Sequence, residues 1–382
     1  MTRVLVVGGG IAGLSAAIAL AMRGAQVDLV EVKPQNAVLG VGIIQPNNAL
    51  RVLDQLGILQ PCLDAGYPTE GWIYYDHRGT ELTRFDSLRL VGDQRPPNNA
   101  LPRPALHAIL TERAEGLGVT VTLGTTVADL VEDEAGVEVT LTDGRRGRYD
   151  LIVGADGIRS ALRRRLFGEG HEPQFVGHSC WRVTVPRPAD LDRCALFFGI
   201  GLKAGMVPLT HDDMYLLLIS NEPSAAHIDP APQRRMLAQY LAHFGGPVAE
   251  AAAHVGPETP IVYTPVEEVI LPAPWGRGRI WLIGDAAHAS TPYLSQGATM
   301  AMEDAVVLAE IATAPDFAPG AGLDAFMARR LPRCRFVQET SHRIGDEGQL
   351  TDPAACAARN ERIRNAEPGK PRPHEMFLAE AI

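Results

Sequence analysis

Residues 3–31 read RVLVVGGGIAGLSAAIALAMRGAQVDLVE, and this stretch decides the fold. Residues 3–7 form a short, apolar, β-branched run, as a buried parallel strand does. The Ala- and Leu-rich run over 14–23 predicts a helix, which Gly24 closes. Residues 26–30 predict a second strand. The order strand, glycine turn, helix and strand is typical of a dinucleotide-binding βαβ unit.

The glycine turn carries the motif G-x-G-x-x-G at Gly8, Gly10 and Gly13. Gly8 permits the tight turn, Gly10 lets the backbone approach a pyrophosphate, and Gly13 lets the helix lie close to the sheet. The helix N-terminus offers free N–H groups to the phosphates. Glu31 ends the second strand, where a carboxylate can accept both ribose hydroxyls. These features favour FAD or NAD over NADP and do not separate the first two.

The same stretch has two other interpretations. A glycine-rich turn can exist without any ligand. Residues 4–22 are also almost free of polar groups, so they could pass for a signal peptide or a membrane helix. Three consecutive glycines make a poor lipid-facing helix, however, because glycine costs about 1 kcal/mol relative to alanine in a helix. We therefore expect no membrane insertion.

Length and composition narrow the function classes. The 382 residues favour about two domains. A net charge of −10 argues against a nucleic-acid partner, and the basic clusters at 145–148 and 163–165 are interpreted as solvated surface. The five cysteines form no CxxC pair, which argues against a disulfide framework, a zinc site or a dithiol redox centre. This cysteine usage favours a reducing cytoplasm.

The rest of the chain predicts a mixture of strands and helices. Two strands over 71–86 join at Arg78-Gly79, residues 119–143 alternate as a strand meander, and 171–222 is rich in strands. The last forty residues are polar and predict a peripheral tail. Helices are expected at 46–57, 105–118, 233–253, 298–313 and 323–343.

Three segments together resemble one family. They are GGGIAG with Glu31, GADGIRS at 154–160, and GDAAHASTPYLSQGATMAMEDA at 284–305. In this order they resemble the single-component FAD-dependent aromatic hydroxylases, the p-hydroxybenzoate hydroxylase-like monooxygenases, and among these the salicylate- and urate-hydroxylase type. The resemblance covers most of residues 1–340 and chooses FAD over NAD as the bound cofactor.

The resemblance implies an α/β fold in which a Rossmann-like FAD-binding domain is interleaved with a β-sheet substrate domain, followed by a C-terminal helical segment. The expected FAD-binding domain is discontinuous, over 1–70, 98–170 and 275–340. The substrate-binding domain is expected over 71–97 and 171–274. Residues 341–382 remain as the peripheral C-terminal tail.

The resemblance also assigns residues to a tight, non-covalent FAD. Arg103, in the element RPAL, is expected to reach the phosphate or ribityl region, and Asp285 to hydrogen-bond the ribityl chain. Asp156, in the DG turn, is expected to serve both FAD and the nicotinamide nucleotide, although Asp is also a favoured N-cap. Arg103 could instead be a surface residue capping a helix. The other expected cofactor contacts are Ile11, Ala12, Lys33, Val127, Gly297, Ala298 and Thr299; no metal is expected.

The turn from Pro292 to Gly297 is expected to pass along the flavin ring. The helix that starts near Ala298 would aim its N–H groups at the edge of the reduced flavin, where negative charge collects. Ser295 stands where the family often has glycine, so the freedom of the ring to move stays open.

The implied reaction uses NADH or NADPH as a transient co-substrate. FAD is reduced, O₂ adds at the flavin C4a, and the distal oxygen of the hydroperoxide attacks an electron-rich aromatic carbon. Such a substrate needs a base or a positive group beside it. Tyr215 and Lys203 are the candidates, with Pro292 against the ring, and His211 is a weaker one. Trp181 and Phe198 are expected to line the pocket.

Several alternatives stay open at this point. Tyr215 could simply pack in the sheet, and Lys203 could be a solvated lysine. The same scaffold supports epoxidation or Baeyer–Villiger oxygenation of a larger natural product, and a flavin-binding redox sensor would need no oxygenase activity. The substrate, the choice of NADH or NADPH, and a monomer or homodimer state are also undecided.

Asp285, His288 and Ser290 lie within six residues and could suggest a hydrolytic triad. A triad is defined by spatial roles, and no G-x-S-x-G nucleophile elbow is present. We interpret His288 and Ser290 as structural residues.

Overall fold

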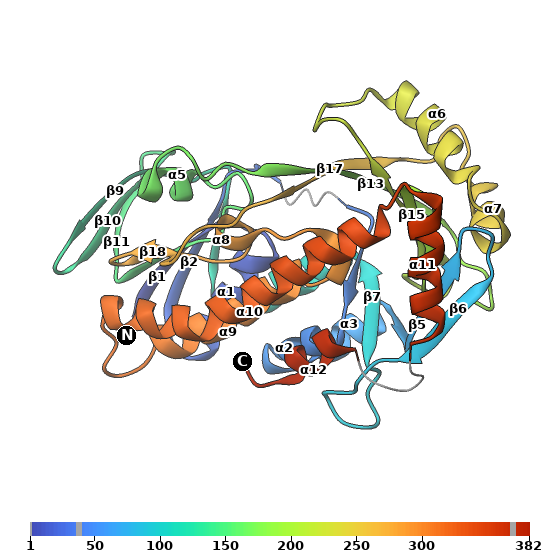
Figure 1. Ribbon diagram of the computed structural model, residues 1–382. Coiled ribbons are helices and arrows are strands. Elements are labelled where there is room, and N and C mark those ends of the chain that lie inside the picture. Colours follow the sequence, from blue (N-terminus) through green and yellow to red (C-terminus); the bar gives the residue numbers. More distant parts are fainter. Residues whose placement is uncertain (1, 36–39, 367–371) are drawn as a thin grey trace.

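The computed structural model describes residues 2–35, 40–366 and 372–382 (Figure 1). One half of the molecule is organised around a sheet with the strand order β18-β19-β12-β1-β2-β8. The pairs from β19 to β8 are parallel, and β18 adds an antiparallel edge. The bounds are β1 Arg3–Val7, β2 Gln26–Glu31, β8 Thr120–Leu123, β12 Leu151–Gly154, β18 Gly276–Arg277 and β19 Ile280–Leu282.

Helices cover this parallel sheet and explain why its central strand is apolar throughout. Residues 4–7 of β1 are all buried, as expected for a strand covered on both faces. Helix α1 packs against α9 and α4, and α9 packs in turn against the long helix α10. The bounds are α1 Ile11–Met22, α4 Arg103–Gly116, α9 Gly297–Ala312 and α10 Pro319–Gly348.

Residues 119–149 differ from the single meander that the sequence predicts. Strand β8 joins the parallel sheet beside β2, whereas the next three strands form their own antiparallel sheet, in the order β11-β10-β9. An alternating pattern predicts a strand but does not identify the partner that it pairs with. The three strands are β9 Val127–Asp133, β10 Gly136–Leu141 and β11 Arg146–Tyr149.

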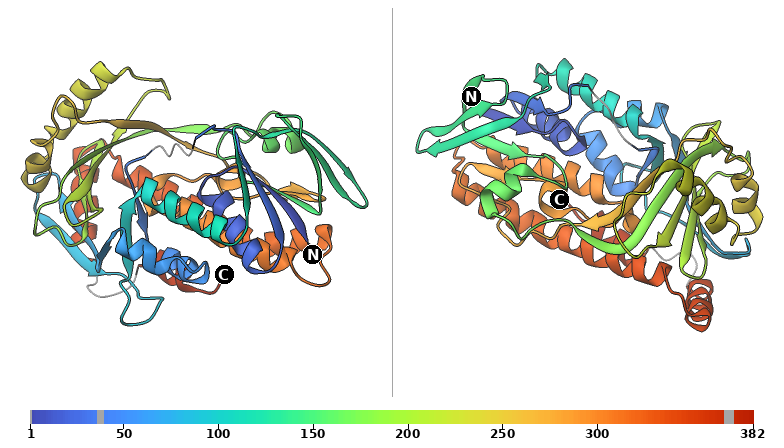
Figure 2. Two further views of the ribbon diagram at one scale, coloured as in Figure 1. Left: turned by 180° about the vertical axis from the view of Figure 1, so that it is seen from behind. Right: turned by 90° about the horizontal axis from the view of Figure 1, so that it is seen from above.

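The other half of the molecule is built on a seven-stranded sheet with the order β17-β13-β16-β15-β14-β5-β6. Two chain segments build it, because β5 and β6 come from residues 71–86 and the other strands from 174–268. The sheet and its helices lie at the far end from β9–β11 in both views of Figure 2. The bounds are β5 Gly71–Asp76, β6 Glu81–Asp86, β13 Gln174–Pro186, β14 Cys194–Phe198, β15 Leu202–Pro208, β16 Asp213–Asn221 and β17 Val262–Glu268.

The two faces of the seven-stranded sheet have different neighbours. One face packs against helices α6 (Pro230–Leu241) and α7 (Gly246–Ala252) and contains the buried Trp181. The opposite face turns toward the parallel-sheet half of the molecule. A small sheet in the order β3-β7-β4 lies between the two halves, with bounds β3 Gly42–Gln45, β4 Tyr67–Thr69 and β7 Asn98–Pro102.

The C-terminal residues pack more closely than the peripheral tail that the sequence predicts for 341–382. Helix α10 continues to Gly348, and it is followed by α11 (Pro353–Arg364) and α12 (Pro373–Ala379). Helix α11 contacts β6, and Leu378 of α12 is 1% exposed. A few well-placed apolar side chains are enough to dock a polar segment, because the other faces of its helices stay in solvent.

The remaining short helices are α2 Asn47–Gln55, α3 Leu59–Asp64, α5 Ala161–Phe167, α8 Asp285–His288 and the 3₁₀ helix η1 Pro292–Leu294. No helix within the described ranges combines the length and the apolar character needed to cross a membrane.

Candidate active site

The glycine motif and Glu31 lie together in a pocket of about 380 Å³ at the end of the parallel sheet. Three glycines shape it in different ways. A Cβ on Gly8 would collide with the carbonyl oxygen of Ala155, and one on Gly13 would collide with the carbonyl oxygen of Gly8. A Cβ on Gly10 would meet no atom within 4 Å, so the space in front of Gly10 is open to a ligand. Ile11 lines the same pocket.

Glu31 is held in place by backbone N–H groups. Its Oε2 accepts a hydrogen bond from the N–H of Gly9 at 2.7 Å, and its Oε1 accepts one from the N–H of Lys33 at 2.9 Å. These bonds fix the carboxylate at the end of β2, where it lines the pocket with Lys33. The position fits a carboxylate that accepts ribose hydroxyls.

Helix α4 supplies a second wall of this pocket. Arg103 lines it at the start of the helix, and burial lowers the pKa of its guanidinium while Asp285 acts to raise it. His107 lies one helical turn later, and its Nε2 is 2.8 Å from the carbonyl oxygen of Gly9. His107 is not among the residues predicted from the sequence, although its spacing of four residues from Arg103 places both on one helix face.

Asp156 lines the pocket but also stabilises the start of α5. Its Oδ1 accepts a hydrogen bond from Ser160 Oγ at 2.5 Å, and its Oδ2 accepts one from the N–H of Leu162 at 3.1 Å. The N-cap of α5 is Ser160 rather than Asp156, so Asp156 supports the helix start from outside, and its place in the pocket wall is compatible with the predicted cofactor role. Val127 differs, since it begins β9 and packs against the main core, while its neighbour Thr126 lines the pocket.

The stretch 284–290 does not assemble a hydrolytic triad. Asp285 is exposed at the start of α8, whereas His288 is buried and pairs with Asp304 through a 2.6 Å contact from Nε2 to Oδ2. Gly284 has a φ of 58°, and a Cβ there would lie 3.0 Å from the Cβ of Ala12. Close packing of this turn against α1 thus explains why small residues stand at positions 284 and 12.

The loop 292–297, which we call the flavin loop after its predicted role, leads into the N-terminus of α9. Ser295 has a φ of 56° and is the one non-glycine residue with positive φ within the described residues. No side chain caps α9, so the N–H groups of Gly297, Ala298 and Thr299 have no intrahelical acceptor. A helix N-terminus in this state attracts negative charge.

A second cavity of about 420 Å³ lies between this loop, the seven-stranded sheet and the C-terminal helices; we call it the interdomain pocket. Residues 293–296 line one side, and Trp72, Tyr74 and Phe198 line the sheet side. Lys203 of β15 projects among them and is 3% exposed. Phe198 thus lines a pocket as the sequence predicts.

Lys203 and Tyr215 do not come together. Lys203 pairs with Ile219 and Tyr215 pairs with Val207, so four residues of strand, about 13 Å, separate them. Tyr215 packs against Ile44 and does not line the interdomain pocket.

The other sheet candidates also lie away from this pocket. Trp181 faces the helices α6 and α7 on the opposite side of the sheet, which corrects its expected place in the pocket wall. His211 is exposed in a turn beside Asp212.

Comparison with known proteins agrees with this geometry. A family model described as an FAD binding domain matches residues 1–341. The 2-heptyl-3-hydroxy-4(1H)-quinolone synthase of Pseudomonas aeruginosa is 36% identical over 367 residues, covering 94% of this chain and 93% of that protein. A 3-amino-4-hydroxybenzoate 2-monooxygenase of Streptomyces platensis is 32% identical over 377 residues, covering 96% and 93%. The chain belongs to the FAD-dependent monooxygenases.

The solved structures include Klebsiella pneumoniae HpxO in complex with FAD and uric acid. Its TM-score is 0.86 at 28% identity, covering 99% of this chain and 95% of that one. These matches confirm the predicted fold class and the predicted cofactor. They also confirm an enzyme rather than a redox sensor.

The residues of this monooxygenase fit FAD on structural grounds. The open space at Gly10 suits a pyrophosphate, the fixed carboxylate of Glu31 suits a ribose, and the uncapped N-terminus of α9 suits the negative edge of a reduced flavin. These three features come from separate parts of the chain. Together they fit a bound FAD, while the other contacts that the resemblance assigns stay predictions.

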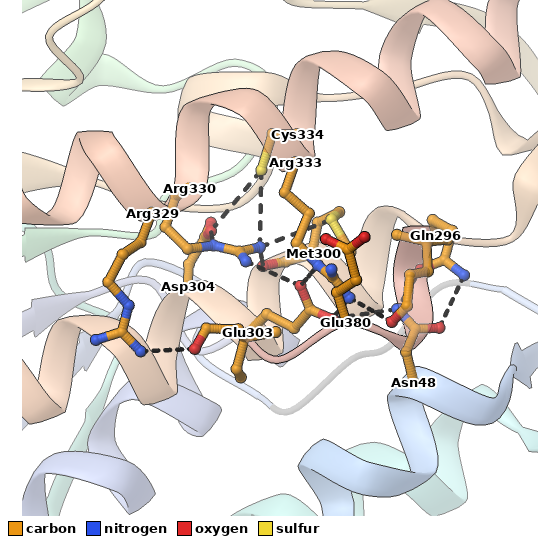
Figure 3. A network of polar contacts seen from close by, with 12 residues as sticks. Asn48, Gln296, Met300, Glu303, Asp304, Arg329, Arg330, Arg333, Cys334 and Glu380 are labelled. Atoms are coloured by element: carbon orange, nitrogen blue, oxygen red, sulfur yellow. Dashed lines mark hydrogen bonds and ion pairs between the residues drawn. The ribbon is translucent and has the colours of Figure 1, made fainter. Parts of the chain in front are cut away.

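Beneath the flavin loop, the monooxygenase buries an ion-pair network that joins α9 to α10 (Figure 3). Arg330 donates from Nε to Asp304 at 2.8 Å and from a terminal nitrogen to Glu303 at 2.9 Å. Arg333 donates to both oxygens of Glu303, at 2.6 and 3.0 Å. These arginines and acids are all 5% exposed or less.

The network reaches the flavin loop through two amides. Asn48 donates from Nδ2 to Glu303 at 3.2 Å and to the side chain of Gln296 at 2.9 Å, and Gln296 donates back at 3.0 Å. Gln296 is the last residue before α9. The network therefore fixes the residue from which the open helix N-terminus begins.

The charges of the network determine how His288 and Asp304 titrate. Burial alone lowers the pKa of His288, but Cys334 and Asp304 outweigh it and raise that pKa well above 6.5. Burial raises the pKa of Asp304, but His288 and Arg330 outweigh it and hold the pKa at about 2. His288, Asp304 and Cys334 lie close enough for a metal, yet Arg330 also contacts Asp304 and Cys334 with a fixed positive charge.

The His288–Asp304 pair predicts a dependence of stability on pH. The raised pKa of His288 contributes stability that is complete below pH 6.5 and is lost as the pH rises through the raised value. The contribution of Asp304 is present above pH 3.8 and is lost as the pH falls toward 2. We expect the stability difference between wild type and His288→Asn to shrink above pH 6.5, by up to about 1.4 kcal/mol per pH unit.

Urea denaturation of both proteins at a series of pH values measures this difference. A stability difference that stays constant from pH 6.5 to 9 would show that folding does not raise the pKa of His288.

Proposed function

We propose that this protein hydroxylates a small aromatic or heteroaromatic ring, with NADH or NADPH and O₂ as co-substrates. The observation that carries the proposal is the position of the interdomain pocket, which lies against residues 293–296 of the flavin loop. The aromatic side chains of Trp72, Tyr74 and Phe198 offer flat surfaces for a ring on the facing side. Relatives named for a hydroxyquinolone and for an aminohydroxybenzoate support this class of substrate.

Bound FAD would supply the electron transfer and the activation of oxygen. This chain would bind the cofactor through Gly10, Glu31 and Arg103, and would place the substrate ring beside Ser295 and Gln296. Enclosure by the sheet and the C-terminal helices would keep water from the reacting atoms.

Lys203 is the group that we propose to act on the substrate hydroxyl. Burial lowers the pKa of Lys203 to about 8, and its Nζ lies 4.5 Å from the ring centroid of Tyr293. In its ammonium form it would stabilise a phenolate, which is the electron-rich form of a phenol. Burial raises the pKa of Tyr215 well above its usual range, so Tyr215 stays a neutral phenol, and its place in the apolar cluster with Ile44 favours a packing role outside the interdomain pocket.

Turnover with a panel of aromatic compounds tests the proposal. We expect particular phenols or hydroxylated heteroaromatics to stimulate NAD(P)H oxidation by the FAD-loaded enzyme by at least about tenfold, and the product to gain 16 Da, the mass of one oxygen atom. Mass spectrometry of the product and the NAD(P)H absorbance are the measurements. Stimulation by non-aromatic ketones or alkenes alone would instead favour Baeyer–Villiger oxygenation or epoxidation.

We further propose a cytoplasmic enzyme that acts as a monomer or homodimer. The five cysteines are all buried free thiols, which supports a reducing compartment.

A further inference from the structure

The interdomain pocket extends beyond the space that a single ring needs beside the flavin loop. Its volume of about 420 Å³ falls in the range of pockets that take drug-sized ligands. The last three helices of the chain supply one part of its wall, which we call the outer end. The apolar side chains at this outer end are Phe336 and Ile344 of α10, Ile363 of α11 and Leu378 of α12, across from Tyr74 and Phe85.

Three basic groups near the outer end are occupied or neutral, while Arg343, Glu347 and Glu375 also line the pocket. Arg359 donates to the carbonyl oxygens of Gly199 at 2.9 Å and Glu347 at 3.2 Å. The guanidinium of Arg372 lies 4.3 Å from the ring centroid of Phe85. Burial lowers the pKa of His374 to about 4, so that side chain is neutral at pH 7. Between these groups, the wall offers hydrocarbon and aromatic side chains to a ligand.

Helix α12 is fixed in place rather than resting loosely on the pocket. Arg333 donates to the carbonyl oxygens of Phe377 at 3.2 Å and Leu378 at 2.6 Å. These carbonyls belong to the last turn of the helix, where Phe377 also accepts a hydrogen bond from the N–H of Glu380 at 3.3 Å.

A second arginine holds the same end of α12. Arg51 of α2 donates to the carbonyl oxygens of Leu378, Ala379 and Glu380 at 3.3, 2.9 and 2.9 Å. The two arginines therefore hold Leu378 at one position in the pocket wall.

We propose that the substrate is an aromatic ring that carries an apolar substituent, and that α12 and α11 bind this substituent. The inference rests on the proposed function, since it places the ring beside the flavin loop. The substituent then runs along Tyr74 and Phe85 toward Leu378 and Ile363. Leu378 and Ile363 are accordingly specificity-determining residues.

Binding of 4-alkylphenols to the FAD-loaded enzyme tests the proposal without any turnover. Phenol, 4-ethylphenol, 4-butylphenol and 4-hexylphenol are titrated in the absence of NAD(P)H, and the change in flavin absorbance gives each Kd. We expect the Kd to fall by about fourfold for each CH₂ group added, as burial of hydrocarbon predicts. An affinity that does not change with chain length overturns the proposal.

Two variants and a control locate the binding surface. Ile363→Ala and Leu378→Ala should each weaken 4-hexylphenol binding by about tenfold and leave phenol binding unchanged. Ile363 is only half-buried, so its variant keeps the test valid if Leu378→Ala fails to fold. Met376→Ala is the matched control, because Met376 lies on the same helix as Leu378 but is 59% exposed.

The outcomes separate this inference from the proposed function. If Met376→Ala weakens binding as much as Leu378→Ala, the outer end is not the binding surface and the inference is wrong. If chain length controls binding but no aromatic compound is turned over, the inference stands and the proposed reaction fails.

Discussion

Replacing Arg330 with methionine is expected to lower the free energy of unfolding by about 3–5 kcal/mol. Arg330 is fully buried and bridges Glu303 and Asp304, which are fully buried as well. Burial alone lowers the pKa of Arg330, but Cys334, Glu303 and Asp304 outweigh it and raise that pKa. Methionine has a similar shape but leaves the two carboxylates with too little positive charge in a region of low dielectric constant.

Chemical denaturation of the apoprotein measures the loss, and Arg329→Met is the matched control. Arg329 is the next residue in the chain and pairs with Glu310, whose side chain is 48% exposed. An ion pair in solvent contributes about 0–1 kcal/mol, so the control should stay close to wild type. Equal stabilities of the two variants would contradict the importance that we give to the buried network.

Replacing Gly10 with alanine should weaken FAD binding by about 10- to 100-fold while the apoprotein folds as before. A Cβ at Gly10 meets no protein atom within 4 Å, and its φ of −78° and ψ of −175° are open to alanine. The methyl group would occupy the space into which a pyrophosphate fits. We expect it to cost one or two charge-assisted hydrogen bonds, worth roughly 1.5–3 kcal/mol.

Two further glycine variants serve as controls for this experiment. Gly13→Ala should lose both FAD binding and stability, because its Cβ would collide with the carbonyl oxygen of Gly8. Gly116→Ala, at the exposed end of α4, should change neither property for the worse. Calorimetric titration with FAD and thermal melting of the apoprotein measure the two effects. Tight FAD binding by Gly10→Ala would place the pyrophosphate elsewhere.

The cofactor half of the site could be predicted from the sequence because its groups are local. Gly8, Gly10, Gly13 and Glu31 belong to one βαβ unit, in which the glycine spacing and the strand ends determine the geometry. The first turn of α9 follows in the same way from the residues beside it. Short-range structure of this kind depends little on the rest of the fold.

The substrate half depended on contacts between distant segments. Strand periodicity could not tell which face of the sheet Trp181 occupies, nor that Lys203 and Tyr215 lie far apart along neighbouring strands. The polar composition of the last forty residues hid the role of α12, because its packing needs only Leu378 and backbone carbonyls that bind Arg51 and Arg333.

The sequence by itself determined the dinucleotide-binding unit of residues 3–31, and its resemblance to a known family added FAD as the cofactor. Only the tertiary structure decided that His288 pairs with Asp304 instead of Asp285, that α9 and α10 share a buried ion-pair network, and that the C-terminal helices close the interdomain pocket. The physical reason is that the first group follows from spacing along the chain. The second group follows from which surfaces the folded chain brings together.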